Sequence, residues 1–211
     1  MKPFLPGAAC AMLSALPSLP AAAAFIGVLP LTPGGTDYQA YYDDQLDITW
    51  AANASLNGAD TWDNQMAWVA GLSIGGVGGW RLPNMDVDGD GTIVDCTSVT
   101  QTTCKDNEYG HLFAYGAGMT LGGGITTANP GPFSNVDPLR YWAGTGLAGD
   151  SSRAWFHTFN FGVSGTNLKT SQDPAWAVHA GNVSAIPVPA TLWLLGSGLL
   201  GLAGMAGRKS A

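Results

Sequence analysis

The chain has 211 residues, enough for one domain or two very small ones. Its formal net charge is −7, but the span 25–187 holds all fifteen acidic residues and only five cations, so its own formal charge is −10. An acidic surface of this kind disfavours nucleic acid and anionic lipid as partners. Thirty glycines, and the prevalence of Asp over Glu, favour short strands and ordered loops over long helices.

The first 24 residues have the layout of a secretory signal peptide. A single cation, Lys2, precedes an apolar stretch, and the alanines at 21–24 form an Ala-x-Ala cleavage site just before Phe25. Four prolines within the first 20 residues argue against a short core helix, which is the alternative interpretation. We therefore expect an exported protein with a signal peptide at 1–24, followed by a lead-in segment at 25–40.

The first regular elements are expected between residues 44 and 70. Apolar side chains alternate with polar ones along 44–50, which predicts a strand with one buried face. Thr61 can cap a helix over 62–70, because its hydroxyl can accept a hydrogen bond from an amide of the first turn. Gly71 suits the end of that helix.

The later elements are short and separated by turns. Trp80 and Leu82 point to one side of a short strand that Pro83 ends, and a second helix is expected over 107–115. A loop rich in glycine and proline follows, and three strands close the domain, at 140–144, 154–163 and 176–179. Two early helices and late strands predict the α+β class, with short antiparallel strands.

The sharpest local motif is the run of alternate carboxylates in DVDGDGTIVD. Such carboxylates can turn inward around a hard cation where glycine allows a sharp turn, and calcium accepts six to eight oxygen ligands. The predicted ligands of a structural calcium ion are Asp86, Asp88, Asp90, Thr92 through its carbonyl, and Asp95. The twelfth position of this loop is Thr97, not the usual Glu, and the alternative is a solvated acidic turn.

Two cysteines remain once the signal peptide has gone, Cys96 and Cys104. An even pair in an exported chain predicts a disulfide. The loop that it closes is short, so we expect the bond to stabilise the domain by roughly 2–3 kcal/mol.

Signals for catalysis are weak. The three histidines, His111, His157 and His179, have no zinc-binding spacing, and no G-x-S-x-G motif occurs. Tryptophan is abundant, and exposed indole rings could stack on sugars, although filling the core is the simpler interpretation.

The C-terminal segment is apolar and ends in two cations, Arg208 and Lys209. Residues 190–207 form a run of about 18 residues, or roughly 27 Å as a helix, which just spans a bilayer. The two cations would keep its end in the cytoplasm, so the domain would face outward. The run could be a permanent anchor, a core helix or a temporary span.

Residues 186–211 resemble a PEP-CTERM sorting signal. The resemblance rests on Pro187 and Pro189 before the apolar run and on the basic end behind it, with Val188 in place of the usual Glu. It implies recognition by an exosortase-type processing enzyme and only transient membrane contact. The protein would pass through the inner membrane to the cell surface or extracellular matrix of a Gram-negative bacterium.

Residues 41–184 resemble the Lcl C-terminal-like domain. The motifs that carry the resemblance are YDDQLDITW, MAWVAGL, GGWRLPN, DNEYGHLF, GPFSNV, YWAGT, AWFHTFNFG and WAV. The resemblance implies a single C-type lectin-like domain, and one family member is associated with glycosaminoglycan binding. Two departures limit the transfer: cations are scarce, and the Glu-Pro-Asn and Trp-Asn-Asp sugar-binding signatures are missing from this sequence.

The expected function is therefore non-catalytic. We expect an exported surface or matrix protein that binds a glycan, such as an exopolysaccharide, or another matrix component, and not nucleic acid. The alternatives are a secreted hydrolase acting on polysaccharide or peptide, and a purely structural matrix protein. A groove with two facing carboxylates, or a histidine paired with an Asp, would favour the hydrolase.

Overall fold

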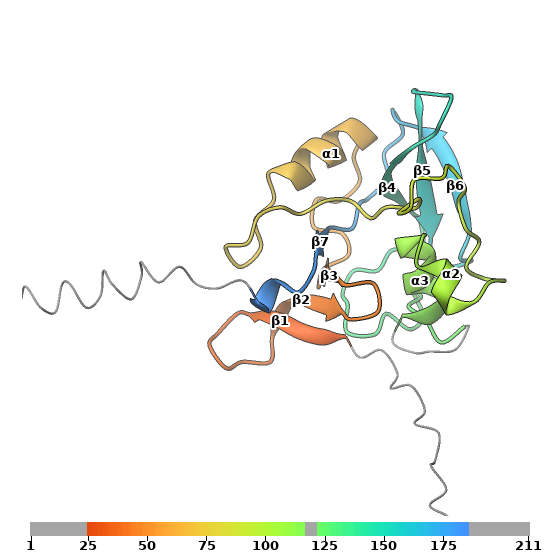
Figure 1. Cartoon of the computed structure of the whole chain (residues 1–211). Helices are drawn as coiled ribbons and strands as arrows, with labels where there is room; N and C mark the ends of the chain where they lie inside the picture. Colours follow the sequence, from red (N-terminus) through yellow and green to blue (C-terminus); the bar gives the residue numbers. More distant parts are fainter. Residues whose placement is uncertain (1–24, 117–121, 186–211) are drawn as a thin grey trace, which may run out of the picture.

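The structure, a computed structural model, describes residues 25–116 and 122–185 (Figure 1). The predicted signal peptide at 1–24 and the predicted sorting signal at 186–211, including its apolar span, lie outside the described residues. Among the residues described, no helix is long and apolar enough to cross a membrane.

The domain contains two antiparallel sheets. The first has the strand order β1 (Ile26–Pro30), β2 (Tyr38–Asp43), β3 (Ile48–Ala51) and β7 (Val178–Ala180). The second has the order β4 (Arg140–Gly146), β5 (Arg153–Thr158) and β6 (Ser164–Leu168). The helices are α1 (Trp62–Ala70), α2 (Gln101–Cys104) and α3 (Glu108–Tyr115), with a final 3₁₀ turn, η1 (Val183–Ala185). The combination confirms the α+β class.

The N-terminal sheet corrects two expectations. Strands β1 and β2 occupy much of the segment that the sequence treats as a lead-in, and Gly27 in β1 lets the ring of Tyr38 lie directly on its backbone. The strand predicted over 44–50 begins only at Ile48. The reason is a turn before it, in which the Asp43 carboxylate accepts hydrogen bonds from the amides of Gln45 and Leu46.

The C-terminal strands differ in a similar way. The strand predicted over 154–163 ends at Thr158, and the chain turns back to form β6, which the sequence pattern does not predict. Gly162 adopts a φ of 66° in this turn, and its amide donates to the Thr158 carbonyl. The ring of Phe113 occupies the space where a Cβ at Gly162 would lie, so glycine is required there. The strand expected over 176–179 is β7, at Val178–Ala180.

The helices follow the sequence more closely. Helix α1 has the expected bounds, but the Thr61 side chain makes no capping bond; instead Asp60 accepts from the Thr61 amide. Helix α3 begins after Asn107, whose side chain accepts from the amide of Gly110 as an N-cap does. Trp80 and Leu82 are buried as expected, but the chain there makes an isolated bridge with β7 and not a strand.

Residues 173–178 are buried and join the two sheets. The Trp142 amide donates to the Pro174 carbonyl, and the Ala51 amide donates to the Ala177 carbonyl. Trp176 lies between them, with its indole N–H donating to the Ala51 carbonyl at 2.8 Å. Its ring contacts Trp50 and Phe133 at centroid distances of 5.4 and 4.9 Å. Four of the seven tryptophans among the described residues fill the core, as the simpler interpretation expected: Trp50, Trp80, Trp142 and Trp176 are all buried.

Candidate functional site

The acidic loop brings together a different set of carboxylates from the predicted one. Oxygen atoms of Asp86, Asp88 and Asp106 all lie within 4.8 Å of one another. Asp106 accepts a hydrogen bond from the Asp88 amide at 2.9 Å. Burial, together with the nearby charges of Asp88 and Asp86, raises the pKa of the Asp106 carboxyl. The sequence pattern does not reveal Asp106, because it lies outside the motif and reaches the loop only through the fold.

The other predicted calcium ligands make local contacts. Asp90 accepts from the amide of Thr92 at 2.6 Å, and its own amide donates to Asp88. Asp95 accepts from the amide of Thr97 at 3.0 Å and from its hydroxyl at 2.7 Å, and these bonds lower the pKa of Asp95. Calcium binding by this loop stays a prediction, with Asp86, Asp88 and Asp106 as the carboxylates that lie close enough to share one ion.

The predicted disulfide is confirmed. Cys96 is bonded to Cys104, and both residues are buried. The bond ties the end of the acidic loop to the short helix before α3, and the Asn107 amide group donates to the Val94 carbonyl beside it. Residues 93–97 are thereby held against the start of α3.

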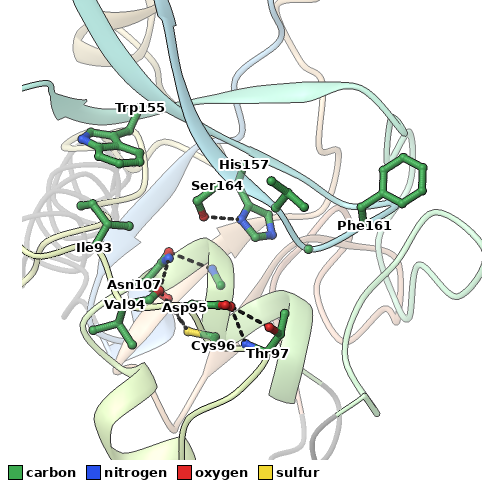
Figure 2. A pocket seen from close by; sticks show the side chains of 13 residues that line it. Ile93, Val94, Asp95, Cys96, Thr97, Asn107, Trp155, His157, Phe161 and Ser164 are labelled. Carbon is green, nitrogen blue, oxygen red and sulfur yellow. Dashed lines mark hydrogen bonds between the residues drawn. The ribbon is translucent and has the colours of Figure 1, made fainter.

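A cavity lies between this segment and the β5–β6 hairpin (Figure 2). We call it the Asp95 pocket; it is lined by residues from 93–97, by Asn107 and Gly110 of the α3 N-terminus, and by hairpin residues between 155 and 164. Its volume is about 340 Å³, within the range of small-ligand sites. Because the acidic loop and the hairpin are far apart in sequence, only the fold assembles this pocket.

Aromatic and polar groups share the lining of the Asp95 pocket. Trp155 is half-buried, whereas Phe161 at the hairpin turn is 77% exposed. In Figure 2 the two rings lie on opposite sides of His157, with Asp95 and Thr97 across from the hairpin. Ser164 adds a second hydroxyl. The pocket therefore offers flat apolar surfaces together with groups that can donate and accept hydrogen bonds.

His157 lies at the base of the pocket. Its Nδ1 atom is 3.0 Å from the Ser164 hydroxyl, while Nε2 is buried and has no partner among the described residues. The ring stacks on Tyr109 at 5.9 Å and contacts Phe159 at 5.2 Å. Burial lowers the pKa of His157 to about 3, although the charge of Asp95 acts in the opposite direction. The imidazole is therefore neutral at physiological pH.

The other two histidines lie elsewhere. His111 is buried in α3, and burial lowers its pKa to about 4, followed by the charge of Lys105. His179 packs on Trp80 at 5.7 Å. Within 25–116 and 122–185, none of the three forms a salt bridge with a carboxylate.

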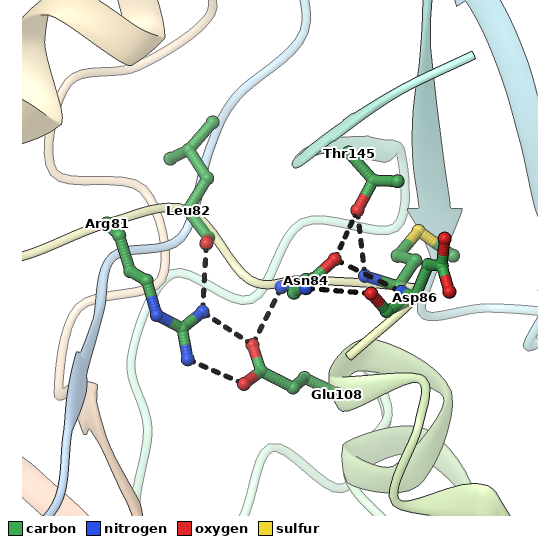
Figure 3. A network of polar contacts seen from close by, with 7 residues as sticks. Arg81, Leu82, Asn84, Asp86, Glu108 and Thr145 are labelled. Atoms are coloured by element: carbon green, nitrogen blue, oxygen red, sulfur yellow. Dashed lines mark hydrogen bonds and ion pairs between the residues drawn. The ribbon is translucent and has the colours of Figure 1, made fainter. Parts of the chain in front are cut away.

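A polar network fixes the Arg-Leu-Pro segment to α3 (Figure 3). Arg81 makes two charged hydrogen bonds with Glu108, at 2.7 and 2.6 Å, and Glu108 also accepts from the Asn84 amide at 2.7 Å. The Thr145 hydroxyl donates to the Asn84 side chain, which in turn accepts from the amide of Asp86. The network thus positions the start of the acidic loop. Glu108, the only Glu of the sequence, has a structural role in it as the partner of Arg81.

The fold and site define a small disulfide-bonded α+β domain with a ligand-sized pocket beside an acidic loop. The family model of the Lcl C-terminal domain matches residues 39–179, so the chain belongs to the Lcl C-terminal domain family. This confirms the resemblance that the motifs of the central region indicate. No curated protein matches the chain. The sorting signal stays a prediction.

Proposed function

We propose that the protein is an exported surface or matrix protein whose Lcl domain, of C-type lectin-like fold, binds a glycan in the Asp95 pocket without catalysing a reaction. The observation that carries this proposal is the pocket itself. Trp155 and Phe161 offer apolar ring faces, and Ser164, Thr97 and Asp95 offer hydrogen-bonding groups. Sugars present both kinds of surface, since their C–H faces suit aromatic rings and their hydroxyls need polar partners.

Export is supported by the chemistry of the chain. The Cys96–Cys104 disulfide suits an oxidising compartment, in line with the signal peptide expected at 1–24. The C-terminal segment would direct the protein to an exosortase-type enzyme at the inner membrane and then to the surface or matrix of a Gram-negative bacterium. A matrix of exopolysaccharide would supply the glycan.

The hydrolase alternative rests on His157 and Ser164, which are in contact. Two features disfavour it. A histidine with a pKa near 3 is a weak base at neutral pH, and its free nitrogen, Nε2, is enclosed by protein atoms. The contact fits a structural role better, in which the histidine packs among Tyr109, Phe113 and Phe159 under the pocket.

A glycan array probed with the full chain, with and without calcium, tests this proposal. We expect binding to a restricted set of glycans, lost in Trp155→Ala and retained in Trp68→Ala, which alters a half-buried tryptophan of α1. Stacking of a nucleobase on an aromatic side chain is worth about 1–3 kcal/mol, and a similar contribution here means that the Trp155 variant should bind about 5- to 150-fold more weakly. Silence across neutral, acidic and basic glycans would refute the proposal.

A further inference from the structure

The Asp95 pocket has an anionic group at its opening. The Asp95 side chain is exposed, and the two hydrogen bonds from Thr97 hold its carboxylate in place. No Lys or Arg lines the pocket. Within the described part of the chain, the three salt bridges use Glu108, Asp173 and Asp150, so Asp95 has no cationic partner there.

The rest of the pocket does not neutralise this charge. His157 below is neutral at physiological pH. Trp155 and Phe161 line the pocket, and aromatic rings attract cations that lie over their faces within about 6 Å of the ring centre. A carboxylate combined with aromatic rings is the combination of groups that recognises an organic ammonium ion, and the acidic surface as a whole would attract such a ligand.

We propose that the ligand of the Asp95 pocket is an amino sugar with a free ammonium group, which binds the Asp95 carboxylate while the sugar ring lies against Trp155 or Phe161. This inference rests on the proposed function and specifies its ligand. Thr97 and Ser164 already have partners in Asp95 and His157, but each hydroxyl oxygen can accept a further hydrogen bond. A sugar hydroxyl can donate that bond, whereas the aliphatic stem of a lysine side chain cannot. The ligand class is thus a polysaccharide that contains amino sugars without N-acetyl groups, for which glucosamine oligomers serve as the probe.

The chain contains a matched control for Asp95. Asp150 accepts hydrogen bonds from the amide and the hydroxyl of Ser152, at 3.0 and 2.6 Å, in the same local arrangement. It lies outside the pocket and is paired with Arg153 at 3.6 Å. Replacing either Asp by Asn removes one charge from a similar turn, but only one of the two changes the pocket.

The test is calorimetric titration of the full chain at pH 6.5 and low ionic strength, with a glucosamine tetramer and its fully N-acetylated counterpart as probes. We expect the free-amine tetramer to bind at least about tenfold more tightly, because a charge-assisted hydrogen bond is lost with the acetylated one. Asp95→Asn should remove about this tenfold preference, and Asp150→Asn should leave it unchanged. Added salt should weaken binding of the free-amine tetramer most.

Three outcomes would overturn the inference. One is that the wild type binds the two tetramers equally tightly and Trp155→Ala binds neither. The protein would then bind glycans in this pocket without recognising an ammonium group. The second is that the free-amine tetramer does not bind while the array shows binding of neutral glycans, which leads to the same conclusion. Tighter binding of a tri-lysine peptide than of the tetramer would assign the pocket to a protein ligand.

Discussion

Lowering the pH from 7 to 5 should destabilise the folded domain, because two histidines are buried as neutral rings. Burial lowers the pKa of His157 to about 3 and that of His111 to about 4, from an ordinary value of 6.5. Between these limits the unfolded chain binds protons that the folded chain does not. The stabilisation is therefore fully present above pH 6.5 and is lost progressively as the pH falls toward 4 and then 3.

The size of the loss follows from the shifts. A pH of 5 lies 1.5 units below 6.5, the pKa of histidine in the unfolded chain, and each pH unit changes the free energy of unfolding by about 1.4 kcal/mol per histidine. Each histidine should thus lower the free energy of unfolding by roughly 2 kcal/mol, and the two together by roughly 4 kcal/mol. Since domains are typically stable by about 5–15 kcal/mol, this is a large fraction.

Urea unfolding followed by tryptophan fluorescence at pH 7, 6 and 5 measures the effect. His157→Leu and His111→Leu should each remove about half of the pH dependence, whatever they do to stability at pH 7. Asp43 acts in the opposite direction, since burial raises the pKa of its carboxyl, but it is common to all variants. A wild-type free energy of unfolding that stays constant from pH 7 to 5, or single variants that keep the full dependence, would refute the reasoning.

Three further predictions concern other parts of the chain. Arg81→Ala should lower the free energy of unfolding by about 3 kcal/mol, because it leaves the Glu108 carboxylate, whose side chain is only 5% exposed, without a cationic partner. Glu108→Gln should cost less, because the Arg81 side chain is 39% exposed and can be solvated; equal urea midpoints for the two variants would contradict this. Millimolar calcium should raise the melting temperature, an effect that Asp106→Asn should abolish and Asp150→Asn should retain; no upward shift in the wild type would exclude the ion. Mass spectrometry of protein recovered from outside the cell should find that residues 192–211 are missing, and their presence would indicate a permanent anchor.

Local sequence signals predict two of the three helices, α1 and α3, whereas the short helix α2 is not predicted. Asn107 before α3 and Gly71 after α1 act through their nearest neighbours, so their positions are visible in the sequence. The strands are less predictable. β6 and the turn before it depend on Gly162 packing against Phe113, a residue more than forty positions earlier. Alternation alone cannot show where such a strand ends.

The candidate site shows the same division. The acidic loop and the two cysteines are visible in the sequence, because their residue types and short spacing imply their chemistry. The identity of the third clustered carboxylate, Asp106, is not. Nor does the sequence indicate that Asp95 faces a hairpin sixty residues later and shares a pocket with Trp155 and Phe161.

The sequence by itself therefore determined the α+β class, the family, the disulfide and the acidic character of the domain, since these depend on composition, short motifs and neighbouring residues. The tertiary structure alone decided which groups meet. His157 lies under the pocket as a neutral ring because Tyr109, Phe113 and Phe159 exclude water around it. Asp95 stays charged at the pocket opening because Thr97 hydrogen-bonds to it while the chain leaves it exposed. The tertiary environment of each side chain therefore decides whether it is neutral, as His157 is, or charged, as Asp95 is.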